Sequence, residues 1–156
     1  MIRPLIATDR APLHEALVTC GAFSEEEVVV ALEVLDDGLK GGLDGDYPHL
    51  VFEKDGVVLG YVAVGRTPMT EATWHLYWIC VHPAAQGMGA GQALQAAAEA
   101  FVAEHGGERI VLETSGRPDY ERTRRFYLAA DYTECGRITD FYKPGDDCVT
   151  YVKRVG

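Results

Sequence analysis

The chain has 156 residues, the usual length of one domain, so we treat residues 1–156 as a single domain. Its 14 Lys and Arg residues against 24 Asp and Glu residues give a formal net charge of −10. A chain of this charge repels the nucleic-acid backbone, which excludes nucleic acid as a ligand. No stretch of the sequence reaches the ~18 apolar residues of a membrane span, and the N-terminus lacks the apolar core of a secretory signal.

The four cysteines are scattered along the chain at Cys20, Cys80, Cys135 and Cys148. None has the Cys-x-x-Cys spacing of a metal or redox site, and no His-x-His pair completes a ligand set. We therefore expect a reduced, cytoplasmic protein with no bound metal.

The first third of the sequence predicts a strand followed by two helices. The strand covers residues 2–7, and Thr8 or Asp9 can cap a helix that continues to about residue 19. Ser24 followed three residues later by Glu27 has the form of a capping box, which predicts a second helix through Leu39. A connection rich in Gly and Asp then extends to Pro48.

Three strands are predicted in the middle of the chain. Residues 49–53 and 57–65 are β-rich and are separated by Lys54-Asp55-Gly56, a typical hairpin turn. Residues 73–82 form a long strand that is apolar at both odd and even positions. This pattern predicts a strand covered on both faces.

The last third predicts a helix over residues 92–105, a buried strand over 109–114 and a helix that begins at Pro118-Asp119. A hairpin of residues 132–142 and 148–155 closes the chain. The predicted order is therefore β-α-α-β-β-β-α-β-α-β-β, with no internal repeat.

A glycine-rich loop lies between the long strand and the helix that follows it. Such a loop directs unpaired backbone N–H groups and the positive end of a helix dipole to one spot, which favours an anion such as phosphate. A P-loop is excluded, because no Lys and no Ser or Thr follow the glycines at Gly89-Ala90-Gly91-Gln92.

The residue pattern of this loop leaves two other interpretations open. A dinucleotide fingerprint finds its first two glycines at Gly87 and Gly89 but meets Gln92 at the third position, although Glu113 would suit a ribose-binding acid. A dinucleotide-binding protein also needs further βαβ units that the sequence lacks. The second interpretation is a turn that merely closes a βα unit.

The loop Gln86-x-x-Gly89-x-Gly91, preceded by Val81-x-Pro83, resembles the coenzyme A loop of the GNAT superfamily of N-acetyltransferases. The element order is similar over essentially the whole chain. The resemblance implies the acyl-CoA N-acyltransferase fold, of class α/β (α+β), in which helices cover both faces of a mixed sheet of about seven strands. It also implies acetyl-CoA as the acyl donor, with no metal.

The resemblance further implies which residues bind the coenzyme. Main-chain groups of the long strand would pair with the pantetheine arm, and the loop would hold the pyrophosphate on its amides. The residues concerned are Ile79, Cys80, Val81, Gln86, Gly87, Met88, Gly89, Ala90, Gly91 and Gln92.

Acetyl transfer to an amine needs an acid for the departing thiolate, and the resemblance points to Tyr127. Phe126-Tyr127 is similar to the family's Phe-Tyr pair, whose tyrosine commonly protonates the thiolate. A packed core tyrosine is the competing interpretation of this residue. The chain departs from the family pattern at Tyr120, where relatives often carry Asn, and at Asp131-Tyr132 in place of Gly-Phe.

A base is also needed, because a free alkylammonium has a pKa near ~10.4 and is mostly protonated at neutral pH. We assign this role to Glu71 or Asp140, with Glu113 as a further candidate. A covalent intermediate on Cys80 is disfavoured, because no His is placed by sequence as its partner.

In this fold the acceptor cleft is bordered by the first two helices and the final hairpin, where acidic residues favour a cationic amine. We assign acceptor binding to His75, Tyr77 and Tyr142. The sequence thus predicts an N-acetyltransferase that acts on a primary amine of a small molecule or peptide by direct attack on the thioester. The alternative is a non-catalytic coenzyme A-binding module, and either form is compatible with a homodimer.

Overall fold

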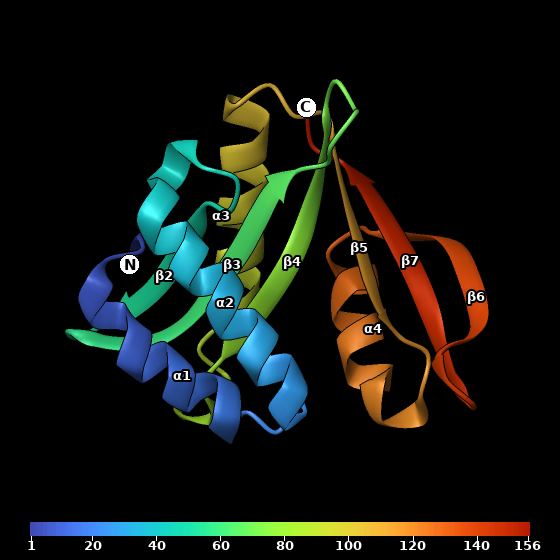
Figure 1. Ribbon diagram of the computed structural model, residues 1–156, viewed down its shortest axis with the longest axis horizontal. Coiled ribbons are helices and arrows are strands. Elements are labelled where there is room, and N and C mark those ends of the chain that lie inside the picture. The colour runs from blue at the N-terminus through green and yellow to red at the C-terminus, as the bar shows by residue number, and fades with distance from the viewer.

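The computed structural model describes all 156 residues as one seven-stranded sheet with four α-helices (Figure 1). The strands are β1 (Ile2–Pro4), β2 (His49–Lys54), β3 (Val57–Arg66), β4 (Thr73–Val81), β5 (Arg109–Ser115), β6 (Thr133–Lys143) and β7 (Asp146–Arg154). The helices are α1 (Arg10–Thr19), α2 (Glu25–Gly41), α3 (Ala90–Glu104) and α4 (Glu121–Ala129). The element order and fold class predicted from the sequence are confirmed.

The sheet order is β1-β2-β3-β4-β5-β7-β6, and only β4 and β5 run parallel. A dinucleotide-binding fold requires repeated parallel βαβ units, whereas this sheet holds a single parallel pair. The dinucleotide-binding alternative is therefore wrong.

Two predicted boundaries are also wrong: the end of the first strand and the start of the last helix. The first strand ends at Pro4, because the Asp9 carboxylate accepts the Ile6 N–H at 2.9 Å and binds Arg3 at 2.7 Å, which holds Ala7–Asp9 in a 3-10 turn. The helix predicted from Pro118 begins instead as a 3-10 turn, and α4 starts at Glu121.

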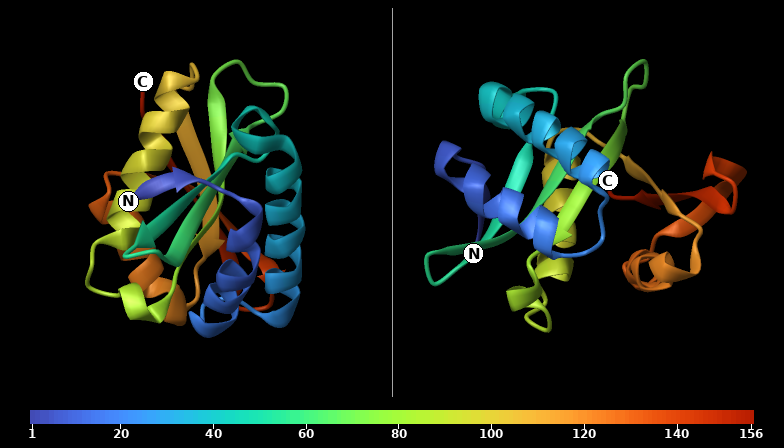
Figure 2. Two further views of the ribbon diagram at one scale, coloured as in Figure 1. Left: turned by 90° about the vertical axis from the view of Figure 1, so that its left-hand side faces the viewer. Right: turned by 60° about the horizontal axis from the view of Figure 1, so that its bottom comes forward.

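Helices cover both faces of the sheet, with α1 and α2 on one side and α3 on the other (Figure 2). The core on the α3 side includes Trp74 and Leu76 of β4, packed with Leu94 and Phe101 of α3. The core on the α1 and α2 side includes Cys80 of β4. The prediction that this strand is covered on both faces is confirmed.

The two parallel strands form a fork (Figure 1). They pair only over Thr73–His75 of β4 and Arg109–Val111 of β5, and beyond these residues they diverge. The edge of β4 that follows His75 therefore has no neighbouring strand on the β5 side. A strand edge without a partner offers free N–H and C=O groups.

A β-bulge lies in β4 next to this fork. Ala63 of β3 pairs with Trp78, but the next residue, Val64, pairs with Leu76, so Tyr77 is the extra residue of the bulged strand. A bulge re-aims the side chains around it. Here it separates Leu76, which faces α3, from Trp78, which packs on the α1 and α2 side.

Gly38 of α2 provides a stability test, because it lies directly over His49. A Cβ at Gly38 would collide with the His49 ring and approach the Tyr47 carbonyl oxygen to 2.8 Å. We expect Gly38→Ala to lower the free energy of unfolding by about 1–3 kcal/mol, measured by urea denaturation. In the control Gly41→Ala the nearest atom is 3.9 Å away, and α2 should gain up to about 1 kcal/mol. Equal losses in both variants would contradict the steric argument.

Candidate active site

The glycine-rich loop between β4 and α3 exposes a set of free amides. Gly87 and Gly89 have φ angles of 78° and 72°, in the left-handed region that glycine adopts without strain. The backbone N–H groups that donate to no protein atom are those of Gly87, Gly89, Ala90, Gly91 and Gln92. Gln86 and Met88, the other predicted loop residues, are exposed. Free amides at the N-terminus of a 15-residue helix suit an anionic ligand.

The open edge of β4 leads directly into this loop. Ile79, Cys80 and Val81 lie on the part of β4 that has no β5 partner. The Cys80 side chain is buried, and those of Ile79 and Val81 are partly buried against the core. Any ligand that follows this edge must therefore bind through main-chain groups.

Phe126 and Tyr127 of α4 lie beside the start of α3. A Cβ at Gly91 would lie 3.2 Å from the Phe126 ring, so a small residue is needed for this close approach. Tyr127 is 5% exposed, packs against Tyr132 and Tyr151, and donates no hydrogen bond to the protein from its hydroxyl. Burial raises its pKa above the ordinary range, so the phenol stays protonated at neutral pH and keeps its O–H as a donor.

A histidine and a glutamate meet across the fork. His75 Nε2 lies 2.7 Å from Glu113 Oε2, although 38 residues separate them in sequence. The His75 ring stacks on Tyr77 with centroids 5.2 Å apart. Since His75 pairs with Val111, Glu113 is two residues further along β5 on the same face.

Tyr142 of β6 is the third residue predicted to bind the acceptor, and its side chain is half exposed. Its pKa is raised by burial, by its hydrogen bond to the Cys148 thiol at 3.8 Å and by the charge of Glu113. Of the three side chains predicted to bind the acceptor, His75 and Tyr77 stack beside the Glu113 carboxylate, whereas the contact of the Tyr142 hydroxyl is to Cys148.

The two predicted bases lie elsewhere. Glu71 is exposed in the connection between β3 and β4, and Asp140 is exposed near the end of β6. Figure 1 places the β3–β4 connection and the β6–β7 turn at opposite ends of the molecule. Asp140 has a φ of 53°, and its carboxylate accepts the Gly145 N–H at 2.8 Å, so it closes the hairpin turn.

Cys80 is a poor nucleophile in this environment. Its hydrogen bond to Cys20 and its burial both raise the pKa of the thiol well above its usual range. A protonated thiol does not attack a carbonyl group. This agrees with direct transfer rather than a covalent intermediate on Cys80.

Tyr120 has a contact that the sequence did not indicate. Its hydroxyl donates to the Ala22 carbonyl oxygen at 2.9 Å, which joins the turn before α4 to the α1–α2 connection 98 residues earlier. Only the departure from the family pattern at this position could have drawn attention to it. The sequence also missed Tyr47, whose ring packs against Tyr77 with centroids 5.4 Å apart.

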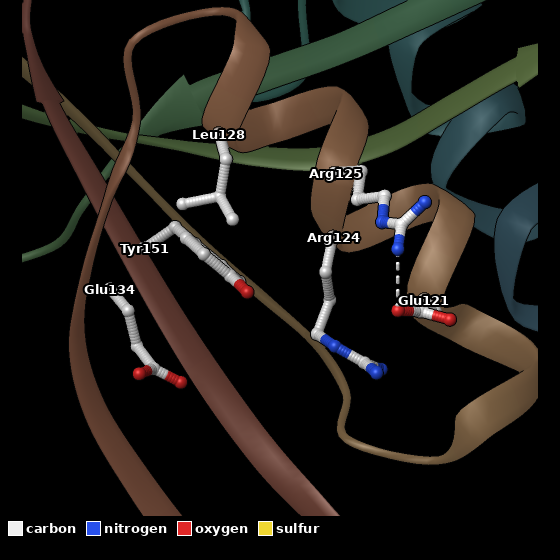
Figure 3. Close-up of a pocket in the computed structure, with 6 residues that line it drawn as sticks. All are labelled: Glu121, Arg124, Arg125, Leu128, Glu134 and Tyr151. Atoms are coloured by element: carbon white, nitrogen blue, oxygen red, sulfur yellow. Dashed lines mark hydrogen bonds and ion pairs between the residues drawn. The ribbon is translucent and has the colours of Figure 1, made fainter.

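Among the hollows of the surface, two lie beside charged side chains away from the glycine-rich loop. One, of about 330 Å³, lies between α4 and the β6–β7 hairpin and is shown in Figure 3. Its basic residues are already engaged: Arg125 pairs with Glu121 at 3.0 Å, and Arg124 donates to the Ser115 and Arg117 carbonyl groups. The two bonds of Arg124 support the β5–α4 turn. The other hollow lies at the C-terminal end of α2.

The helices of this protein are all too short or too polar to cross a membrane. Nowhere do three or more His, Cys, Asp or Glu side chains gather as a metal-ligand group.

The sequence and the structure of this chain are similar to those of known proteins. Residues 12–132 match the model of the acetyltransferase (GNAT) family. A GNAT-family protein from Desulfovibrio desulfuricans is similar over 100% of this chain and 99% of its own, with 35% sequence identity and a TM-score of 0.95. Curated protein sequences give no match.

More distant structures share the fold. An aminoglycoside 6′-N-acetyltransferase complexed with coenzyme A is 14% identical over 100% of this chain and 97% of its own, with a TM-score of 0.76. The ribosomal-protein-S18-alanine N-acetyltransferase from Escherichia coli is 18% identical over 100% of this chain and 94% of its own, with a TM-score of 0.77.

Proposed function

Since the chain belongs to the acetyltransferase (GNAT) family and is an acyltransferase, we propose that it moves an acetyl group from acetyl-CoA to a primary amine of a small molecule or peptide. The observation that carries the proposal is the His75–Glu113 pair at the fork, which lies between an open strand edge and a group of aromatic side chains.

The residues present fit the coenzyme. The free amides of Gly87 and of residues 89–92 suit the pyrophosphate, because they supply several donors and a helix dipole at one place. The main chain of Ile79–Val81 suits the amide groups of the pantetheine arm, because an extended arm can add to the β4 edge as a further strand does. When bound, acetyl-CoA supplies the thioester that the amine attacks.

Glu113 is the base that the geometry favours. Its Oε1 is free to accept a proton from the acceptor ammonium, while Oε2 is held by His75 Nε2. His75, stacked on Tyr77, fixes the position of the carboxylate and can share the proton. Tyr127 is the proposed acid, since its hydroxyl has no hydrogen-bond partner within the protein and is not among the fully buried polar atoms, so it is free to donate to a ligand. Glu71 and Asp140 remain the competing predictions for the base.

The proposal is tested by thiol release from acetyl-CoA with a panel of amines, amino acids, peptides and aminoglycosides. We expect coenzyme-dependent turnover with at least one cationic amine. Coenzyme binding without turnover of any acceptor would favour the non-catalytic module, and failure to bind the coenzyme would contradict both interpretations.

The glycine loop makes a separate prediction about coenzyme affinity. Gly89→Ala places a side chain at a φ of 72°, a strain of about 1 kcal/mol, although no atom lies within 4 Å of the new Cβ. We expect the Kd for coenzyme A to rise about fivefold, measured by calorimetry. Gly136→Ala in β6, with 3.9 Å of clearance and no positive φ, is the control and should bind normally. An unaltered Kd in Gly89→Ala would mean that the left-handed turn does not shape the site.

A further inference from the structure

The hollow at the C-terminal end of α2 is lined by two acids and one lysine, which leaves an excess of one negative charge. Its volume is about 420 Å³, and it is lined by Asp37, Lys40, Gly41, Gly45, Asp46 and Tyr47. Neither Asp37 nor Asp46 forms an ion pair within the chain. The neighbouring Asp36 differs in this respect, because Arg10 binds it at 2.7 Å.

Aromatic rings connect this hollow to the proposed active site. The Tyr47 ring meets Tyr77 edge-on at 5.4 Å, and Tyr77 stacks on His75 at 5.2 Å. His75 in turn holds Glu113 at 2.7 Å. Tyr47, Tyr77 and His75 thus form a continuous row of rings between the hollow and Glu113.

Gly65 of β3 allows this arrangement. A Cβ at Gly65 would collide with the Asp46 carbonyl oxygen and lie 2.9 Å from the Tyr77 ring. The Asp46 main chain and Tyr77 thus pack against the same point of β3. The pKa of Tyr77 is raised first by burial, then by the neighbouring Tyr47, and also by the charges of Glu113 and Asp46. Both carboxylates therefore affect the same phenol.

We infer that the preferred acceptor is a dication, with its reacting amine at Glu113, a second ammonium group at Asp46 and an apolar linker along Tyr77 and Tyr47. Aromatic faces and an unpaired carboxylate attract an alkylammonium group, and a monoamine leaves the hollow unfilled. This inference rests on the proposed function and specifies the substrate class of the same site.

The test compares linear diamines of increasing length with monoamines of the same length. We expect kcat/KM of the wild-type protein to favour a diamine by about tenfold or more, mainly through KM. In Asp46→Asn this preference should fall close to one. Asp55→Asn is the matched control, because Asp55 is an exposed acid in the β2–β3 turn, and it should keep the wild-type preference.

Equal kcat/KM values for diamines and monoamines in the wild-type protein would overturn the inference, as would an equal loss for both in Asp46→Asn. Calorimetric titration of the diamine into the complex of the protein with coenzyme A measures diamine binding independently of turnover. It therefore distinguishes failure of the dication site from failure of the proposed acetyl transfer. Diamine binding that weakens in Asp46→Asn, without turnover of any amine, would contradict the acetyl transfer but not the dication site. Turnover of monoamines with no diamine preference would contradict only the dication site.

Discussion

Replacing Glu113 with Gln is expected to lower kcat for acetyl transfer by about 10²- to 10³-fold, because the amide keeps the shape of the side chain but cannot accept the ammonium proton. The Kd for coenzyme A should stay unchanged, since the coenzyme site is built from the glycine loop and the β4 edge. Initial rates and coenzyme calorimetry on the same preparations measure both quantities.

The dependence of kcat on pH tests whether the deficit of Glu113→Gln comes from the loss of a base. As pH rises toward the acceptor pKa of ~10.4, a larger fraction of the amine needs no base, so the deficit of Glu113→Gln should shrink. Glu71→Gln and Asp140→Asn test the two bases predicted from the sequence in the same assay. A loss of kcat confined to either of these variants, with Glu113→Gln fully active, would transfer the role of base to that residue.

Tyr127→Phe is expected to lower kcat by about 10²-fold, because the departing thiolate loses its proton donor while the ring still fills its place in the core. Coenzyme affinity and the free energy of unfolding should change little, since the hydroxyl has no protein partner to lose. Steady-state kinetics with acetyl-CoA and thermal unfolding measure these effects.

Two controls bear on the role of Tyr127. An acetyl aryl thioester, whose thiolate leaves without protonation, should be used by Tyr127→Phe with a much smaller deficit. Tyr151→Phe removes a hydroxyl from a neighbouring ring, 6.1 Å away between centroids, and should keep the wild-type kcat. Equal deficits with both acyl donors would exclude Tyr127 as the acid.

Local sequence signals account for much of the fold. The Ser24 side chain accepts the Glu27 N–H at 3.1 Å and starts α2, and the Asp55-Gly56 turn joins β2 to β3 with positive φ at both residues. These features depend on a few neighbouring residues, so their pattern can be found in the sequence alone.

The candidate active site is harder to predict from the sequence, because it depends on the register between distant strands. The sequence made Glu113 only a further candidate for the base, and the pairing of His75 with Val111 is what brings it beside the imidazole. The bulge at Tyr77 and the contact of Tyr47 with Tyr77 likewise arise only when the strands and the connection after α2 are assembled. No local pattern encodes such contacts.

The single bond from Tyr120 to Ala22 has a consequence for how ligands leave. The short pairing of β4 with β5 closes one end of the fork, which opens toward its other end (Figure 1). The bond from Tyr120 to Ala22 joins the turn before α4 to the α1–α2 connection. We expect a ligand bound between β4 and β5 to leave more slowly while this bond is closed, although the bond takes no part in the chemistry.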